Sequence, residues 1–202
     1  DRLIVVDENG RVIDGDQIMA LISLNMKNSG RLKGEGLVST VMSNLGLERF
    51  LEAEGMRLER TKVGDRFVLE RMKQLGWNLG GEQSGHMILS DYATTGDGMV
   101  AALQVLSVMV RQSRRASEVL NQFPPVPQVL KNVRFTGANP LDADPVKDVI
   151  REVEGEFGNA GRLVIRPSGT EPLIRVMAEG DDAAFVDQAV NRICEVVRAS
   201  AG

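Results

Sequence analysis

Three prolines stand within four residues near the middle of the chain, at positions 124, 125 and 127. Because proline fixes its own φ angle and has no backbone N–H group, neither a helix nor an inner strand continues through such a segment. The prolines therefore predict a boundary between two folding units. A chain of 202 residues, 43% of them hydrophobic, is long enough to build a separate core on each side.

Before this boundary, strand-like and helix-like segments alternate. We expect strands at 3–6, 36–41, 56–61 and 77–80, and helices at 14–26, 47–53, 66–75, 99–110 and 117–122. The apolar residues of 3–6 are typical of a buried strand, and those of 99–110 are typical of a helix in the core. Strands that alternate with helices at this spacing predict an α/β domain over residues 14–123, with a mostly parallel sheet.

After the boundary, the elements follow in a different order. We expect strands at 129–135, 162–165 and 173–177, and helices at 145–157 and 182–199. This β-α-β-β-α order predicts a smaller α+β domain over residues 128–202. The single cysteine, Cys194, has apolar neighbours at helical spacing, so we expect a buried core residue rather than a reactive thiol.

A phosphate-binding turn is predicted between the last two strands. Arg166, Ser168, Gly169, Thr170 and Arg175 lie in and around this turn. The hydroxyl and guanidinium groups supply the donors and the positive charge that phosphate oxygens need, and the glycine lets backbone amides approach closely. An ordinary polar turn also uses proline, glycine, serine and threonine, so composition alone leaves both interpretations open. The arginine on each side favours the anion site.

A second polar segment, Gly80–His86, follows a strand of the first domain, at the place where ligands bind to open α/β sheets. If the segment stays extended, Glu82 and Ser84 point to one side, where they can bind sugar hydroxyls. His86 is the only histidine; it either contacts a phosphate or assists proton transfer, or it is structural, as a lone histidine more often is. Nearby, Asp65 stands at the start of a predicted helix, and capping that helix is its simplest role.

Composition excludes several classes of function. A net charge of −4 and a pI near 5.2 give no basic surface for nucleic acid, and we interpret the arginines of 111–115 as a helix-end preference. No apolar run reaches the roughly 20 residues that span a membrane, so we expect a cytoplasmic protein without a membrane partner. One histidine and one cysteine exclude a zinc-type cluster, which leaves a hard cation held by oxygen as the candidate metal.

The two polar segments together resemble the α-D-phosphohexomutase superfamily. Arg-Pro-Ser-Gly-Thr-Glu-Pro at 166–172 resembles the phosphate-binding loop of that family, and Gly-Glu-Gln-Ser-Gly-His at 81–86 resembles its sugar-binding loop. Gln83 and the stretch 61–66 are similar to the bacterial phosphoglucosamine mutase branch, whereas phosphomannomutase/phosphoglucomutase relatives usually carry methionine at the position of Gln83. The resemblance implies a C-terminal fragment, with 1–13 as a remnant of domain 2, 14–123 as domain 3 and 128–202 as domain 4.

The resemblance also implies roles for single residues. Asp1 and Arg2 resemble the end of the family's Asp-Gly-Asp-Ala-Asp-Arg metal loop. Asp1 is therefore expected to bind Mg²⁺, in a site that is incomplete in this chain, and Arg2 is expected to be catalytic together with His86. Gly64 and Asp65 are expected to bind substrate, as are Glu82, Ser84 and the five residues of the phosphate turn.

The reaction that the resemblance implies interconverts glucosamine 6-phosphate and glucosamine 1-phosphate through a phosphoserine and a bisphosphate intermediate. The phosphoserine and two of the three metal aspartates would lie outside these 202 residues, so we expect the chain alone to bind its phosphosugar weakly and to have no mutase activity. A phosphomannomutase/phosphoglucomutase and a non-catalytic phosphosugar-binding module are the alternatives. We expect a homodimer of the complete protein, without a nucleic-acid partner.

Overall fold

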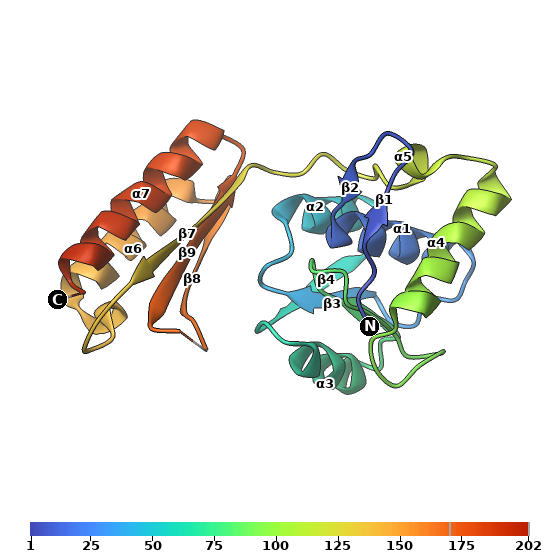
Figure 1. Ribbon diagram of the computed structural model, residues 1–202, viewed down its shortest axis with the longest axis horizontal. Coiled ribbons are helices and arrows are strands. Elements are labelled where there is room, and N and C mark those ends of the chain that lie inside the picture. The colour runs from blue at the N-terminus through green and yellow to red at the C-terminus, as the bar shows by residue number, and fades with distance from the viewer. Residues whose placement is uncertain (170, 202) are drawn as a thin grey trace. The chain divides into compact units, whose positions relative to one another are not determined.

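The computed structural model describes residues 1–169 and 171–201, and the chain divides into two compact units, Asp1–Pro125 and Val126–Gly202. The first unit is an α/β unit with a mostly parallel sheet, and the second is a smaller α+β unit (Figure 1), which confirms the predicted fold class. Among the described residues, no helix is both long enough and apolar enough to cross a membrane.

The main sheet of the first unit has the strand order β4-β3-β5-β6. β3 runs parallel to both β4 and β5, with Val38 opposite Gly80, and β6 is antiparallel to β5. The carboxyl ends of β3, β4 and β5 therefore lie at one edge of the sheet. The strand bounds are β3 Gly36–Thr40, β4 Arg57–Thr61, β5 Leu79–Gly81 and β6 Met87–Leu89.

Helices cover both faces of this sheet, and the inner strands β3 and β5 are buried on both sides. Leu37 belongs to the core cluster that includes residues of α1, α2 and α4, whereas Val38, the next residue, belongs to the cluster that includes α3 on the opposite face. Three of these helices begin at side-chain caps: Asp14 for α1, Asn44 for α2 and Asp97 for α4. The helix bounds are α1 Gly15–Asn28, α2 Leu45–Ala53, α3 Asp65–Leu75, α4 Gly98–Gln112 and α5 Ala116–Val119.

A separate two-stranded ribbon precedes α1. It consists of β1 Val5–Val6 and β2 Val12–Ile13, which pair antiparallel. The prediction of a buried strand at 3–6 is wrong for one face, because the side chains of Ile4 and Val6 are exposed; within the described residues, β1 pairs only with β2. The prediction of a core helix at 99–110 is wrong in the same way, because one face of α4 is exposed.

Two further expectations are corrected at the level of single elements. The sequence interpretation missed β6, whose three residues directly follow a glycine-rich segment that was interpreted as a ligand loop. The helix expected at 117–122 is α5, which already ends at Val119 because the chain there turns toward the prolines. Neither correction changes the order of the parallel strands that carry the candidate site.

The second unit is a three-stranded antiparallel sheet, in the order β7-β9-β8, with its helices packed on one face (Figure 1). Cys194 on α7 is a free thiol buried in this core, which confirms the interpretation as a packing residue. Burial raises the pKa of this thiol, which disfavours the reactive thiolate. The bounds are β7 Gln128–Arg134, the short η1 helix Pro140–Asp142, α6 Asp144–Phe157, β8 Gly161–Pro167, β9 Leu173–Gly180 and α7 Ala183–Ala199.

Candidate functional site

Two loops at the carboxyl edge of the parallel strands carry the candidate residues of the first unit. One loop follows β4 and ends at Gly64, directly before Asp65, the first residue of α3; the other follows β5 and contains Glu82. A hydrogen bond joins them, in which the Gly64 amide donates to Oε1 of Glu82 over 3.1 Å. The hydrogen bond thus holds together two loops that α3 separates in the sequence. Parallel strands predict this proximity, because their carboxyl ends lie at the same edge of the sheet.

The segment after β5 is a tight turn and not an extended strand. The Gly85 amide donates to the Glu82 carbonyl over 3.0 Å, and the Glu82 amide donates to the His86 carbonyl over 2.8 Å. Gly85 has a φ angle of +88°, which closes the turn and favours glycine. The condition under which Glu82 and Ser84 would point to one side, an extended segment, is therefore not met, and Ser84 is exposed at the tip of the turn.

His86 lies buried between two carboxylates from distant parts of the chain. Its Nδ1 atom is 3.7 Å from an oxygen of Asp1, and its Nε2 atom is 3.8 Å from an oxygen of Asp65. Both distances exceed that of a hydrogen bond, and Nε2 is buried with no hydrogen-bond partner among the described residues. Both acidic side chains are more than half exposed, so the imidazole forms the floor of a small acidic site.

Asp65 does not cap its helix. It is the first residue of α3, and the cap position falls to Gly64, which has no side chain. The Asp65 carboxylate accepts a hydrogen bond from the neighbouring Arg66 amide, so it stays at the helix start beside His86. The simplest interpretation of this residue from the sequence, as a helix cap, is therefore wrong, and its carboxylate is available at the site.

Two glycines allow close approaches around His86, and the sequence indicates a close backbone approach only for Gly85, which belongs to the segment 80–86. A Cβ atom at Gly96 would overlap the imidazole ring, and one at Gly85 would overlap the carbonyl oxygen of Leu3. The Leu3 amide donates to the Gly85 carbonyl over 2.9 Å, so the first residues of the chain run beside the loop. The sequence places Gly96 only beside Asp97, the residue that caps α4, and nothing in it indicates the contact with His86.

Asp1 and Arg2 are exposed at the edge of an open hollow of about 630 Å³. The start of α4, including Gly98 and Met99, forms another part of its lining. In the described part of the chain no three His, Cys, Asp or Glu residues cluster so that they could hold a metal ion. Asp1 offers one carboxylate, a suitable ligand for Mg²⁺, but this chain by itself does not complete a magnesium site.

Gln83 anchors the same turn to α1. Its side-chain amide donates to Oδ2 of Asp14 over 3.2 Å, and its carbonyl accepts from the Gly15 amide over 3.2 Å. Burial raises the pKa of Asp14, and burial raises the pKa of the neighbouring Asp16 to about 7. The Asp16 carboxylate accepts from the Asn44 amide over 2.7 Å, so α1 and α2 are joined beneath the turn.

In the second unit, Arg166 on β8 lies directly opposite Arg175 on β9. The Nε atoms of both guanidinium groups are buried and have no hydrogen-bond partner among the described residues. Burial lowers the pKa of Arg166, since it disfavours the charged form, and the like charge of Arg175 on the opposite strand lowers this pKa further. Cross-strand pairs of like charge are unfavourable unless an anion compensates them.

The turn between these strands is held by the backbone. The Ser168 amide donates to the Leu173 carbonyl over 2.8 Å, and the Leu173 amide donates to the Glu171 carbonyl over 2.8 Å. Gly169 is exposed, and a Cβ atom there would meet nothing within 4 Å in the chain. Glu171 pairs with Arg134 at the end of β7 over 3.2 Å. Thr170, which the sequence predicts to be part of the phosphate turn, lies outside the described residues.

Comparison with known proteins places these features in context. Residues 14–126 match the family description "Phosphoglucomutase/phosphomannomutase, alpha/beta/alpha domain III", and residues 130–196 match "Phosphoglucomutase/phosphomannomutase, C-terminal domain". The chain is 68% identical to the phosphoglucosamine mutase of Sphingopyxis alaskensis over 200 residues, which make up 99% of this chain and 45% of the relative. It is 65% identical to that of Novosphingobium aromaticivorans over 201 residues, 100% of this chain and 45% of the relative.

The fold is also similar to that of a solved structure, Aspergillus fumigatus N-acetylphosphoglucosamine mutase in complex with GlcNAc-6P and magnesium. The TM-score is 0.76 with 19% sequence identity, and the match covers 98% of this chain and 46% of that chain. The chain spans less than half the length of the proteins that it matches.

Proposed function

Since the chain belongs to the phosphoglucomutase/phosphomannomutase family, we propose that the complete protein is a phosphoglucosamine mutase that interconverts glucosamine 6-phosphate and glucosamine 1-phosphate. In this reaction a phosphoserine donates its phosphoryl group to one end of the sugar, the bisphosphate turns around, and the serine is rephosphorylated from the other end. The 202 residues carry the substrate-binding part. The identity of 68% to a phosphoglucosamine mutase supports this sugar over the other sugars of the family.

The observation that carries the proposal is the pair of arginines on β8 and β9. Arg166 and Arg175 lie opposite each other on neighbouring strands, and each has a buried Nε donor without a partner in the described part of the chain. A bound phosphate would satisfy these donors and offset the like charges at once. We assign the arginine pair, with Ser168, Gly169 and Thr170, to the phosphate that is not reacting.

The loop after β5 is the candidate grip for the sugar ring. Oε1 of Glu82 accepts from the Gly64 amide, and the second carboxylate oxygen can accept from a sugar hydroxyl. The Ser84 hydroxyl is exposed at the tip of the same turn, where it can donate or accept. Because Gln83 points to α1 instead, we assign to it the positioning of this turn and not contact with the sugar.

The reacting end of the substrate is assigned to the site around His86. A buried Nε2 atom with no partner in the described residues costs free energy that a ligand oxygen can recover. We propose that His86 and Arg2 contact the transferring phosphoryl group, with Gly64 and Asp65 at its border. Asp1 would supply one ligand of a Mg²⁺ ion whose other protein ligands come from the rest of the complete protein; the bound ion offsets phosphoryl charge.

Two measurements test the function. The complete protein should turn over glucosamine 6-phosphate faster than glucose or mannose phosphates, whereas the 202-residue chain should show no turnover. In NMR titrations, millimolar glucosamine 6-phosphate should shift the amides of 82–86 and of the turn after β8 in the 202-residue chain. If the complete protein prefers mannose or glucose phosphates, it is a phosphomannomutase/phosphoglucomutase. If it turns over none of these sugars, the result favours a non-catalytic phosphosugar-binding module.

We place the protein in the cytoplasm, which agrees with one cysteine that is free and buried. A homodimer of the complete protein is the proposed assembly. Light scattering on the complete protein, over a range of concentrations, measures the assembly directly.

A further inference from the structure

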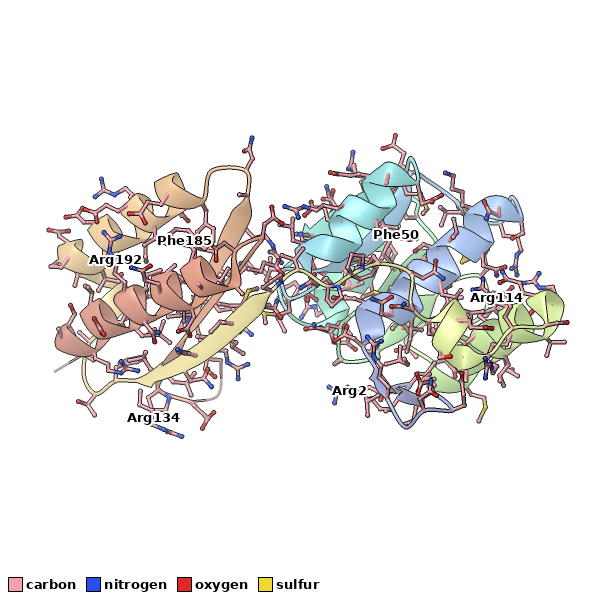
Figure 2. The ribbon with its side chains drawn as sticks, turned by 90° about the horizontal axis from the view of Figure 1, so that it is seen from above. Arg2, Phe50, Arg114, Arg134, Phe185 and Arg192 are labelled. Carbon is pink, nitrogen blue, oxygen red and sulfur yellow. The ribbon has the colours of Figure 1, made fainter. Side chains whose placement is uncertain are left out.

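Two buried serine side chains connect the turn after β5 to the interior of the first unit. Ser39 lies on β3, and Ser43 lies in the loop between β3 and α2, the helix that Figure 2 marks with Phe50. Both serines are fully buried. The Ser39 hydroxyl donates to the Gly81 carbonyl over 2.8 Å, and the Oγ atoms of the two serines lie 2.6 Å apart. Since Gly81 directly precedes Glu82, the serines act on the backbone that carries this carboxylate.

The peptide group between Gly81 and Glu82 is therefore held at both of its ends. Its carbonyl accepts from Ser39, and its N–H group, the Glu82 amide, donates to the His86 carbonyl over 2.8 Å. Because a peptide group is planar, two hydrogen bonds at opposite ends fix its orientation. That orientation sets the direction in which the Glu82 side chain leaves the backbone.

The number of hydroxyl hydrogens decides the direction of these hydrogen bonds. Each serine hydroxyl has one hydrogen to donate, and a carbonyl oxygen only accepts. Since Ser39 gives its hydrogen to the Gly81 carbonyl, the 2.6 Å contact is a hydrogen bond only if Ser43 donates to Ser39. The Ser43 hydroxyl then has no second hydrogen for another acceptor.

Asp16 is the neighbour that can compete for the Ser43 hydrogen. It is the second residue of α1 and is buried. Its Oδ2 atom accepts from the Asn44 amide over 2.7 Å, and the Ser43 side chain hydrogen-bonds to the same carboxyl group. An ionised carboxylate draws the Ser43 hydrogen away from Ser39, because it carries a full charge and only accepts. A protonated Asp16 leaves that hydrogen to Ser39.

The surroundings of Asp16 favour the uncharged form. Its Oδ1 atom is buried and has no hydrogen-bond partner among the residues that the structure describes, which is unfavourable for a charged carboxylate. Burial raises the pKa of Asp16 to about 7, and the like charge of Asp14 adds to this shift, whereas Ser43 and Arg60 oppose it. Arg60 on β4 pairs with Glu48 on α2 over 3.0 Å, which offsets part of its charge.

We propose that Ser39 is a positioning residue for the turn after β5, and that Ser43 and an uncharged Asp16 keep its hydroxyl directed at the Gly81 carbonyl. Ionisation of Asp16 releases this carbonyl, and the turn then holds Glu82 less firmly. The importance of this link for the substrate rests on the proposed function of Glu82 as a sugar ligand. Ser39 itself acts through the backbone and does not need to touch the sugar.

The carbonyl carbon resonance of Gly81 tests the link directly. It is measured by triple-resonance NMR in the 202-residue chain. Loss of the hydrogen bond should move this resonance upfield in Ser39→Ala. Ser23→Ala is the matched control, because Ser23 on α1 is equally buried and its hydroxyl donates to a backbone carbonyl, that of Met19, over 2.7 Å. The control should leave the Gly81 resonance unchanged.

A pH titration of the same resonance tests the role of Asp16. In the wild type the Gly81 resonance should move upfield between pH 6 and pH 8, because the raised pKa of Asp16, about 7, lies in this interval. Asp16→Asn stays uncharged and should not show this movement. His86 is present in both proteins, so the difference between the two titrations belongs to Asp16.

Kinetics of the complete protein show whether the link positions the substrate. Ser39→Ala should raise KM for glucosamine 6-phosphate roughly 2- to 10-fold, the effect of one hydrogen bond, and change kcat less. The reason is that Glu82 holds the sugar equally in the ground state and in the transition state. Ser23→Ala should change neither constant.

The outcomes separate this inference from the proposed function. An unmoved Gly81 resonance in Ser39→Ala would overturn the link, and equal pH shifts in the wild type and Asp16→Asn would overturn the role of Asp16. If Ser39→Ala does not fold, the two titrations decide. A shifted resonance with an unchanged KM would overturn the positioning role. The resonance reads the link in the chain itself, so this result does not depend on whether the complete protein is a mutase.

Discussion

Replacement of Arg175 by methionine should stabilise the second unit while it removes phosphate binding. Methionine keeps much of the length of the side chain but removes the charge and the guanidinium donors. In the ligand-free protein, Arg175 lies opposite Arg166 on the neighbouring strand, and each buried Nε atom lacks a partner in the described residues. The substitution removes the repulsion between the two guanidinium groups and one buried donor without a partner. Both are unfavourable in the ligand-free protein, and a bound phosphate would compensate both.

The magnitude follows from these two contributions. A like-charge pair directly across antiparallel strands costs about 0.2–1 kcal/mol. A buried donor without a partner costs about 1–3 kcal/mol, and the low end applies here because both side chains are partly exposed and screened by solvent. We therefore expect a stabilisation of about 1 kcal/mol, equal to a rise in Tm of about 4–8 °C for a unit of this size.

Calorimetry is the appropriate assay, because Trp77 and Tyr92 both belong to the first unit and fluorescence does not report on the second. Inorganic phosphate at ten times its Kd should stabilise the second unit of the wild type by about 1.4 kcal/mol and leave Arg175→Met unchanged. Arg151→Met, which removes one exposed charge on α6 that pairs with Asp148, is the matched control and should keep the phosphate response.

Two results would refute this reasoning. A loss of stability in phosphate-free buffer would show that the Arg175 guanidinium supports the fold. An undiminished response to phosphate in Arg175→Met would show that the anion binds elsewhere in the second unit.

Three further predictions concern the first unit. Gly96→Ala should displace His86, because a Cβ atom would overlap the imidazole, and should lower kcat of the complete protein about 10- to 100-fold with a smaller change in KM. Asp16→Asn should stabilise the unit by at most about 4 kcal/mol at pH 8, and much less at pH 4. Burial raises the pKa of Asp16 in the folded protein from 3.8 to about 7, so the wild type loses stability as the pH rises from 3.8 through 7, and the uncharged Asn does not. Gln83→Leu should raise KM for glucosamine phosphate, and a double-mutant cycle with Asp14→Ala should give a coupling of about 1 kcal/mol.

Controls accompany each of these variants. Gly155→Ala on α6, where a Cβ atom would meet nothing within 4 Å, should leave kcat unchanged. For Asp16→Asn, urea titrations followed by the fluorescence of Trp77 at pH 4 and pH 8 give the two free energies of unfolding, and an equal gain at both values would contradict the burial argument. If the effects of Gln83→Leu and Asp14→Ala on KM simply add, the anchor has no role in positioning the turn.

Much of the fold follows from local sequence because its elements have local causes. The parallel strand β3 contains Leu37, Val38 and Thr40, which are apolar or β-branched. Asp97 and Asp182 begin their helices with a side-chain cap. Burial was less predictable. The apolar pattern of 3–6 and 99–110 is typical of elements covered on both sides, but cover is a property of the whole protein, and the described chain covers one side.

The residue types at the candidate site are visible in the sequence, but their contacts are not. The turn at 82–85 closes because Gly85 adopts a positive φ angle, which the sequence permits without requiring. Asp65 approaches His86 because the parallel strands place the ends of β4 and β5 at one edge of the sheet, and because α3 begins at Asp65 itself. The contact of Gly96 with His86 joins residues ten positions apart, because the segment after β6 folds back and the Asp97 amide donates to the Met87 carbonyl over 3.0 Å; no periodic pattern indicates it.

The backbone contact between the first residues and the turn after β5 has a consequence for protein engineering. The Leu3 amide is bonded to the Gly85 carbonyl, and Arg2 pairs as an isolated bridge with His86. A change of sugar preference by grafting residues 82–86 from another family member would therefore also move Asp1. Such a graft should succeed only when the donor's Asp-Arg-Leu segment is transplanted with its loop, as one cassette.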